Sequence, residues 1–348
     1  MRYIGIIILL VLCLTLLLLT GCIINTVTPE TTIGNLGNQE NTEEPVIENT
    51  EEPVMWSGLG MVLYSSQASF VDTLLANGFT ELRIDIPDYQ NTSWLANSKA
   101  TLPGIIAKGA KVIWGVSSNS GNDEDYTITA ENWPTFRQAI LDNAQWAQNN
   151  GVYEFQLGNE EELHVDGTTM VVAQIIANLK SVATDVQVIF TRGNVSYTCF
   201  NNNIVDWISV GKGDIDILAT NVYIGGEGYY GSNNWKTYIT NLVNAFGADG
   251  TYITEFNLSW SSLDDYSTDE AVQAAAVTEM IDYIKASGMT RAFYYAWKSD
   301  KYGVVKNDGI YRLLWNQALL NLGSIKFATV PTKTATISLP NTIALLLK

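Results

Sequence analysis

The segment YEFQLGNEEE, Tyr153–Glu162, joins a strand pattern to a run of acids. Apolar side chains alternate with polar ones up to Gly158-Asn159, as expected of a β-strand. Three glutamates follow directly. They predict either a solvated loop or functional carboxylates at the carboxyl end of the strand. The sequence on either side decides between these two interpretations.

Short apolar runs alternate with amphipathic segments on both sides of this strand. The expected strands are Gly58–Tyr64, Glu81–Ile86, Lys111–Ser117, Tyr153–Gly158, Gln187–Thr191, Asp216–Tyr223, Thr251–Phe256 and Thr290–Trp297. The expected helices are Gln67–Asn77, Asn97–Lys108, Glu131–Asn150, Thr168–Ala183, Ile204–Val210, Trp235–Phe246, Thr268–Ser287 and Tyr311–Leu322. Strict alternation indicates parallel strands joined by crossover helices. Eight units in about 270 residues match the α/β fold called the (β/α)8 or TIM barrel. A doubly wound open sheet is the alternative, but no glycine-rich phosphate loop follows the first strand.

Residues 1–22 predict a lipoprotein signal peptide. Arg2 provides the positive start, Ile6–Leu19 is almost wholly apolar, and the run ends in Leu-Thr-Gly-Cys22. Small residues before a cysteine suit cleavage followed by attachment of a lipid to the thiol. A plain membrane anchor is the alternative, but a span needs roughly 20 apolar residues. We therefore expect an extracellular lipoprotein held at the cell surface through Cys22.

Residues 23–54 predict a disordered acidic linker. The segment contains seven glutamates and no lysine or arginine, and it is rich in Thr, Asn and Pro. Such a composition buries too little apolar surface to offset the cost of ordering the chain. The whole chain has a formal net charge of −17. This charge argues against nucleic acid or an anionic membrane surface as a partner, so we expect contact with the membrane only through the lipid.

Residues 55–323 form the expected barrel domain, and residues 324–348 are a C-terminal extension to which we assign no role. Cys199 is the only cysteine outside the signal and lipid site, so no disulfide within the mature chain is expected. The chain contains one histidine, His164, and no HExxH motif. We expect no metal and no cofactor, and we expect a monomer.

Two glutamates occupy the expected ends of strands on opposite sides of the barrel. Asn159-Glu160 ends the fourth strand, and Glu255 lies near the end of the seventh. In this fold the carboxyl ends of the strands surround the active site. Alternation in YITEF predicts that Glu255 shares a face with Ile253, opposite Tyr252 and Thr254. Glu160 and Glu255 would face each other, as the two carboxylates of a glycosidase do.

Other strand ends provide groups that could serve this pair. Arg83 ends the second strand, and a fixed cation keeps a nearby carboxylate charged. Asn221 and Tyr223 share a face of the sixth strand, where both could hydrogen-bond. Trp297 ends the eighth strand, and its indole face would stack on a pyranose ring.

This pattern resembles the clan A glycoside hydrolases, which are (β/α)8 retaining β-glycosidases. Their strands two, four, six, seven and eight carry Arg, Asn-Glu, Tyr, Glu and an aromatic residue, in that order. The matching residues here are Arg83, Asn159-Glu160, Tyr223, Glu255 and Trp297. The resemblance covers about residues 57–322 and includes cellulases and mannanases related to family 5, without a clean fit to one family of the clan.

The resemblance implies a role for each matching residue. Glu160 would be the acid/base and Glu255 the nucleophile, while Asn159 would bind the sugar 2-hydroxyl. Arg83 and Tyr223 would steer the nucleophile. Trp297 would form the floor of the site, with a cis peptide at Trp297-Lys298.

The substrate implied by the resemblance is an extracellular β-linked polysaccharide, with β-1,4-glucan or mannan favoured. The sequence TEFN resembles the nucleophile strand of family 5, but Asn221 stands where many members have histidine. Asn221, His164 and Trp260 are further expected sugar contacts, and the optimum is expected at mildly acidic pH. Glu161 and Glu162 are expected to be loop acids, and Glu154 to be structural. The alternatives are a non-catalytic carbohydrate-binding lipoprotein, or an exo-glycosidase or transglycosylase of the same clan.

Overall fold

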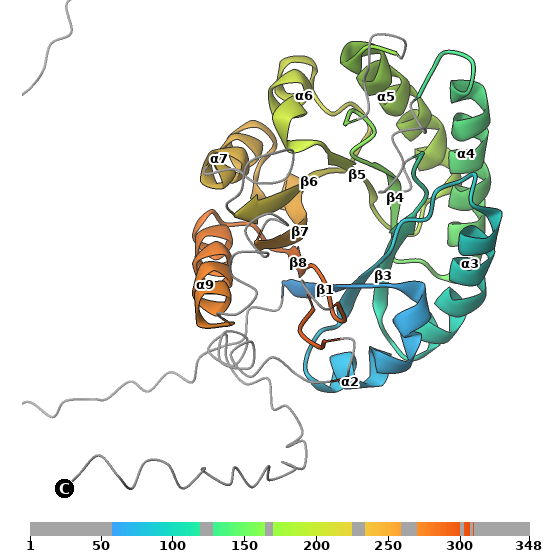
Figure 1. Cartoon of the computed structure of the whole chain (residues 1–348). Helices are drawn as coiled ribbons and strands as arrows, with labels where there is room; N and C mark the ends of the chain where they lie inside the picture. The colour runs from blue at the N-terminus through green and yellow to red at the C-terminus, as the bar shows by residue number, and fades with distance from the viewer. Residues whose placement is uncertain are drawn as a thin grey trace, which may run out of the picture. The chain divides into compact units, whose positions relative to one another are not determined.

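The computed structural model describes residues 58–118, 128–163, 170–224, 234–258, 270–299, 303–306 and 309. Eight parallel strands close into a barrel, each strand pairing with its neighbours in chain order (Figure 1). The strands are β1 Leu59–Leu63, β2 Glu81–Ile84, β3 Lys111–Gly115, β4 Glu154–Asn159, β5 Val195–Cys199, β6 Ile217–Ile224, β7 Thr251–Leu258 and β8 Ala292–Tyr294. The (β/α)8 barrel expected from the sequence is therefore confirmed.

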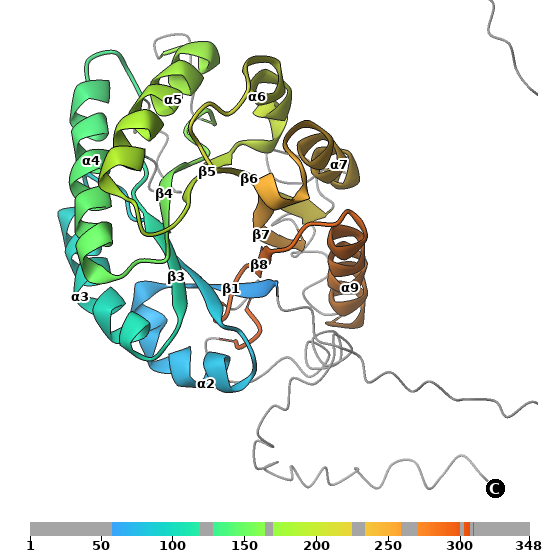
Figure 2. The same ribbon diagram turned by 180° about the vertical axis from the view of Figure 1, so that it is seen from behind.

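The helices form a ring outside the barrel, as both views along its axis show (Figures 1 and 2). The α-helices are α2 Val71–Ala76, α3 Thr92–Ala107, α4 Trp133–Asn150, α5 Val172–Ile189, α6 Ile204–Val210, α7 Trp235–Phe246 and α9 Glu270–Ala286. Short 3-10 helices are η1 Ser65–Phe70, η2 Asn201–Asn203 and η3 Ala248–Gly250. The sequence placed α6 and α7 at these bounds.

The fifth strand lies later in the chain than the sequence pattern predicted. The expected strand Gln187–Thr191 begins inside α5, which extends to Ile189. Buried residues along α5 continue at helical spacing as far as Val186, so its β-branched end belongs to an amphipathic helix. The real strand β5 follows a turn at Gly193. A Cβ there would lie 1.9 Å from the Tyr153 carbonyl oxygen, so only glycine permits this approach.

Two separate apolar layers hold the barrel together. The larger one lies between strands and helices and includes Leu82, Val112 and Leu179. The smaller one fills the barrel interior and is built around Ile113 and Tyr252. Strand residues therefore alternate between the two layers and are buried on both faces, which explains the nearly continuous apolar runs in the sequence.

The lower end of the barrel interior is ionic. The Arg291 guanidinium donates a 2.7 Å hydrogen bond to Glu154, which is fully buried, and lies 3.4 Å from a carboxylate oxygen of Glu81. The Tyr252 hydroxyl donates to the other oxygen of Glu154 at 2.7 Å. Glu154 thus belongs to a buried and paired structural cluster below the mouth, as its position within the strand suggested.

Several expectations concern residues outside the described ranges. They are the signal peptide 1–22 with Cys22, the linker 23–54, the helix Tyr311–Leu322 and the extension 324–348. Within the described ranges, no helix combines the length and apolar character needed to cross a membrane.

Candidate active site

Arg83 organises the carboxyl end of the barrel. It is buried, and its guanidinium makes three hydrogen bonds to side chains on two other strands. Nη1 donates to Glu255 Oε1 at 2.6 Å, Nη2 to Asn159 Oδ1 at 2.8 Å, and Nε to Gln156 Oε1 at 3.0 Å. One cation therefore fixes β2, β4 and β7 relative to each other, and the planar fork of arginine suits this task.

Glu255 reaches the interior because β7 contains a bulge. The pairing of β7 shifts register against β6 at this point, and also against β8 between Ile253 and Phe256. Ile253 and Phe256 face the outer core, while both residues between them face inward. Thr254 Oγ1 accepts a hydrogen bond from Thr198 Oγ1 at 3.1 Å, and the Glu255 carboxylate accepts one from Arg83. The alternation expected for this strand was wrong here, because a bulge adds one residue and re-aims the side chain that follows.

The Glu255 carboxylate is held at both oxygens. Arg83 occupies Oε1, and the Tyr223 hydroxyl on β6 donates to Oε2 at 2.5 Å. The Glu255 side chain is 14% exposed, whereas Arg83 is 2% exposed. Arg83 is therefore almost completely buried, whereas part of the Glu255 side chain remains accessible. This arrangement orients an anion toward an incoming electrophile.

Glu160 follows β4 in an unusual backbone conformation. Its φ is +57°, in the left-handed region that side chains other than glycine seldom adopt. Its amide donates to the Thr198 carbonyl at 2.7 Å, which holds the turn. Strain of this kind persists where surrounding structure imposes it and often accompanies function. The residue is 2% exposed, and among the described residues its Oε1 has no hydrogen-bond partner.

Burial raises the pKa of Glu160 to about 8, and the charge of Glu255 adds to this rise. A hydrogen bond from the Asn221 side chain and the charge of Arg83 lower this pKa, against the larger effect of burial. Glu160 therefore carries a proton at neutral pH. The interaction with Glu255 also shows that the structure brings the two expected carboxylates together.

Glu161 is buried, contrary to its expected place as a loop acid. Its carboxylate accepts from Ser117 Oγ at 2.8 Å and from the Asn159 amide at 3.0 Å, and it also bonds Ser118. It thereby ties the end of β4 to the loop after β3. Burial raises the pKa of Glu161 to about 7, against these donors. A Cβ at Gly158 would lie 2.6 Å from a Glu161 oxygen, which explains the glycine beside it.

Glu162 is also a buried structural acid. It accepts from Trp207 Nε1 at 2.5 Å, from the Tyr197 hydroxyl at 2.7 Å and from the Phe200 amide at 3.3 Å. Burial raises its pKa. All three adjacent glutamates are therefore buried, and of the three only Glu160 has an oxygen without a hydrogen-bond partner among the described residues. Acidic residues directly after a strand suggested an exposed loop, because local sequence does not show hydrogen-bond donors that lie 35 or more residues away.

The structure corrects the placement of Trp297. It is fully buried in the outer core and packs against Phe70, with ring centroids 6.0 Å apart. The aromatic residue that reaches the site from this side is Tyr295, whose ring makes an edge contact with Tyr223 at 6.4 Å. The cis peptide is Tyr295-Ala296, two residues earlier than expected. Strict alternation would put Tyr295 and Trp297 on the same face, but Tyr295 and Ala296 both belong to the inner layer, so Trp297 falls in the outer core.

Trp114 and two of the expected sugar contacts, His164 and Trp260, complete the account of the aromatic and histidine residues. Trp114 is core, fully buried, with its Nε1 donating to Ser98 at 2.9 Å. His164 and Trp260 lie outside the described ranges. Over the ranges that the structure does describe, no group of three His, Cys, Asp or Glu side chains could hold a metal ion.

Comparisons with known proteins give no sequence relative. No family model matches the chain, and no curated protein matches it. Solved structures resemble its fold. One is an exo-β-1,4-mannosidase from Opitutaceae bacterium strain TAV5, with 12% identity and a TM-score of 0.59. The match covers 76% of this chain and 59% of the mannosidase chain, so this chain spans about three-fifths of that enzyme.

Two shorter enzymes are covered more fully. A GH10 endoxylanase from a sugarcane soil metagenome has 12% identity and a TM-score of 0.55, over 76% of this chain and 96% of that one. A GH5 lichenase from Caldicellulosiruptor sp. F32 has 13% identity and a TM-score of 0.53, over 73% and 83%. At these identities the likeness shows the fold alone. The chain is a (β/α)8 barrel, and its structural neighbours are glycoside hydrolases built on the same barrel.

Proposed function

We propose that the chain is a retaining β-glycoside hydrolase, with Glu255 as nucleophile and Glu160 as acid/base. One observation carries the proposal: two carboxylates at one barrel mouth lie in opposite environments. Glu255 accepts from a guanidinium and a hydroxyl, which suit an anion. Glu160 is buried with an unpartnered oxygen and a raised pKa, which suits a proton donor. Environments that separate two carboxyl groups in this way assign acid and nucleophile roles.

The first step forms the glycosyl-enzyme. A Glu255 oxygen attacks the anomeric carbon while the bond from that carbon to the leaving oxygen breaks. Glu160 transfers its proton to the leaving oxygen, so the departing alcohol is neutral. Arg83 and Tyr223 keep the nucleophile aimed from below. A retaining reaction of this kind needs a separation of about 5–5.5 Å between the two carboxyl groups.

The second step uses the same pair in reversed roles. Once Glu255 is esterified its charge is gone, and one of the contributions that raise the pKa of Glu160 disappears. Glu160 then serves as a base that takes a proton from water as the water attacks the anomeric carbon. The sugar leaves, and both carboxyl groups return to their starting states. The reaction uses two carboxyl groups and water, so the proposal includes no cofactor.

The proposed substrate is an extracellular β-linked polysaccharide, with β-1,4-glucan or mannan favoured and endo action expected. Support for a β-linked substrate comes from the residue pattern and from neighbours named as an exo-β-1,4-mannosidase, a lichenase and an endoxylanase. Attachment to the cell surface through the lipid on Cys22 would place a monomeric enzyme beside such polymers. The proposals on endo action and on location rest on the sequence.

The test is release of reducing sugar by the full chain from β-glucan, mannan, xylan and galactan, together with Glu255→Ala. Activity should vanish in the variant and return with azide as an α-glycosyl azide, because azide fills the space of the lost carboxylate. Glu131→Ala, in the exposed turn before α4, is the matched glutamate control and should retain activity. A β-glycosyl azide would refute Glu255 as the nucleophile. Inactivity of the wild-type chain on every polymer, with binding retained, would favour the non-catalytic alternative.

A further inference from the structure

Three successive backbone amides at the end of β4 each donate to a different acceptor. The Asn159 amide donates to Glu161 Oε1 at 3.0 Å, and the Glu160 amide donates to the Thr198 carbonyl at 2.7 Å. The Glu161 amide donates to the Tyr197 hydroxyl at 3.0 Å. These bonds hold the backbone on both sides of Glu160, whose φ is +57°. Left-handed backbone at such a residue persists only where the surrounding structure imposes it.

The Glu161 carboxylate is itself held by donors from the loop after β3. Ser117 Oγ donates to Oε1 at 2.8 Å, the Ser118 amide donates to it at 3.2 Å, and the Ser118 hydroxyl bonds the other oxygen. Glycine at position 158 leaves room for this carboxylate over the strand. The acceptor of the Asn159 amide is therefore fixed to a second strand end and does not depend on the turn alone.

The Tyr197 hydroxyl joins the third glutamate to the same turn. It donates to Glu162 Oε2 at 2.7 Å while it accepts from the Glu161 amide. Tyr197 and Glu162 are both buried, and Trp207 Nε1 donates to the other Glu162 oxygen at 2.5 Å. Glu162 therefore orients the hydroxyl that accepts from the Glu161 amide, and the turn is held from the β5 side as well as from the β3 side.

The same turn is connected to the proposed nucleophile. Asn159 Oδ1 accepts from Arg83, whose guanidinium also donates to Glu255. A shift of the Asn159 backbone would therefore move Glu160 relative to Glu255. A misplacement of about 1 Å at a reacting group can lower a rate about 100-fold. The bond from the Asn159 amide to Glu161 thus bears directly on whether the proton donor reaches the leaving oxygen.

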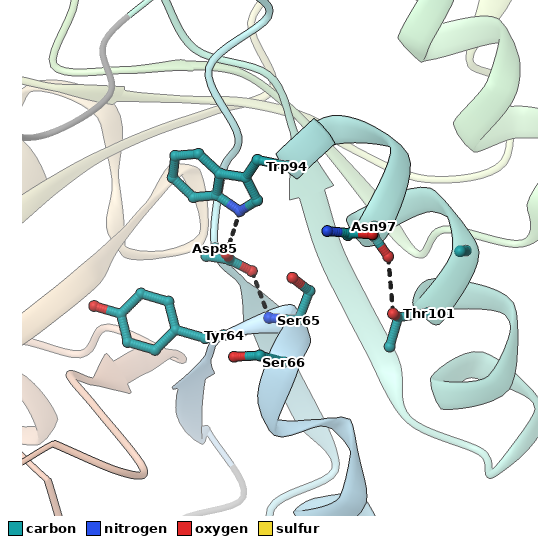
Figure 3. A pocket seen from close by; sticks show the side chains of 8 residues that line it. Tyr64, Ser65, Ser66, Asp85, Trp94, Asn97 and Thr101 are labelled. Carbon is teal, nitrogen blue, oxygen red and sulfur yellow. Dashed lines mark hydrogen bonds between the residues drawn. The ribbon is translucent and has the colours of Figure 1, made fainter. Parts of the chain in front are cut away.

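Two other buried acids of the barrel make their hydrogen bonds elsewhere. Asp85, which follows β2, accepts from the Ser65 amide at 2.8 Å and from Trp94 Nε1 at 2.6 Å, in the wall of a pocket between η1 and α3 (Figure 3). Glu154 begins β4 and belongs to the ionic cluster at the lower end of the barrel. Of these three acids, Glu161 is the one that accepts from a backbone amide of the turn.

We propose that Glu161 is a positioning residue for the proton donor: it holds the Asn159 amide, so that Glu160 keeps its turn and its orientation toward the leaving oxygen. The inference rests on the proposed function and assigns a task to an acid that the two chemical steps do not use. Burying a carboxylate costs free energy unless donors surround it, and here those donors connect two strand ends. Loss of Glu161 should impair proton transfer and spare the attack by Glu255, which Arg83 holds separately.

The test compares Glu161→Ala with the wild-type full chain on two aryl β-glycosides of the same sugar, in the gluco and manno series. A 2,4-dinitrophenyl group departs without a proton, whereas a phenyl group needs the proton of Glu160. We expect kcat/KM to fall about 10- to 100-fold on the phenyl glycoside, in line with a misplaced general acid. On the dinitrophenyl glycoside kcat/KM should change less than about threefold, because the nucleophile is intact.

Glu161→Gln should retain activity on both substrates. Its amide oxygen replaces Oε1 as acceptor for the Asn159 amide and Ser117, while its NH2 group donates to the Ser118 hydroxyl. Glu154→Gln is the matched control, because it also changes a buried and hydrogen-bonded glutamate of β4. It should leave the ratio of the two kcat/KM values unchanged. A selective loss on the phenyl glycoside in this control would show that any damage to β4 disturbs proton transfer, and would overturn the inference.

Equal loss on both glycosides in Glu161→Ala would overturn the inference, and so would no loss on either. If Glu161→Ala does not fold, as judged by thermal melting, Ser117→Ala removes one donor to the carboxylate. It should show the same selective loss at about threefold, and an unchanged ratio would reject the inference. A wild-type chain that cleaves neither glycoside would refute the proposed function and the inference with it. An active wild-type chain with an unselective Glu161→Ala would reject the inference alone.

Discussion

Replacing Glu160 by glutamine should stabilise the protein at alkaline pH and leave its stability nearly unchanged at acidic pH. The folded chain holds the Glu160 proton up to a pKa of about 8, against an ordinary value of 4.5. Between these two values the folded state binds more protons than the unfolded state, so wild-type stability falls as pH rises. Glutamine does not titrate and carries no buried charge.

The size of the effect follows from the shift in pKa. Each pKa unit corresponds to about 1.4 kcal/mol, so the advantage of the variant should grow to about 3–5 kcal/mol by pH 8.5. Urea unfolding of both proteins at pH 5, 7 and 8.5 measures it, since charges common to both cancel in the difference. Glu131→Gln, at an exposed position, is the control and should stay within about 0.5 kcal/mol at every pH. An advantage of the same size at pH 5 and pH 8.5 would show that Glu160 is not held protonated, and the assignment of the acid would fail.

Three further predictions concern catalysis. The kcat/KM of the wild-type chain should decline on the alkaline side with an apparent pKa near 8, as Glu160 loses its proton; a decline centred near pH 5 in a pH–rate profile would contradict this. Tyr223→Phe removes the 2.5 Å hydrogen bond to Glu255 and should lower kcat/KM about 10- to 100-fold in steady-state assays, with folding intact by circular dichroism. Arg83→Lys retains the charge but cannot serve three partners on two strands. It should lose both activity and about 3 kcal/mol of stability in urea, and a fully active, stable variant would show that geometry matters less than charge.

The alternation of strand and helix patterns along the chain was enough to predict the architecture. Repeated strand and helix patterns are local, and parallel strands joined by helices have few ways to close. The meeting of the two glutamates was predictable for the same reason: Glu160 and Glu255 lie at the ends of strands four and seven, and the barrel brings all strand ends to one rim. The position of Arg83 at the end of strand two was visible in the same way.

Tertiary structure decided which way individual side chains point and which buried glutamates have hydrogen-bond donors. The bulge in β7 turns Glu255 inward. After β8, Tyr295 faces the barrel interior, whereas Trp297 lies in the outer core. Burial of Glu161 and Glu162 depends on serines, a tyrosine and a tryptophan that lie far away in sequence. A one-residue change of register reverses the face of a strand, and a distant donor decides whether a buried acid is tolerated. Local sequence reveals neither the register nor the distant donor, whereas it does reveal the alternation of strands and helices.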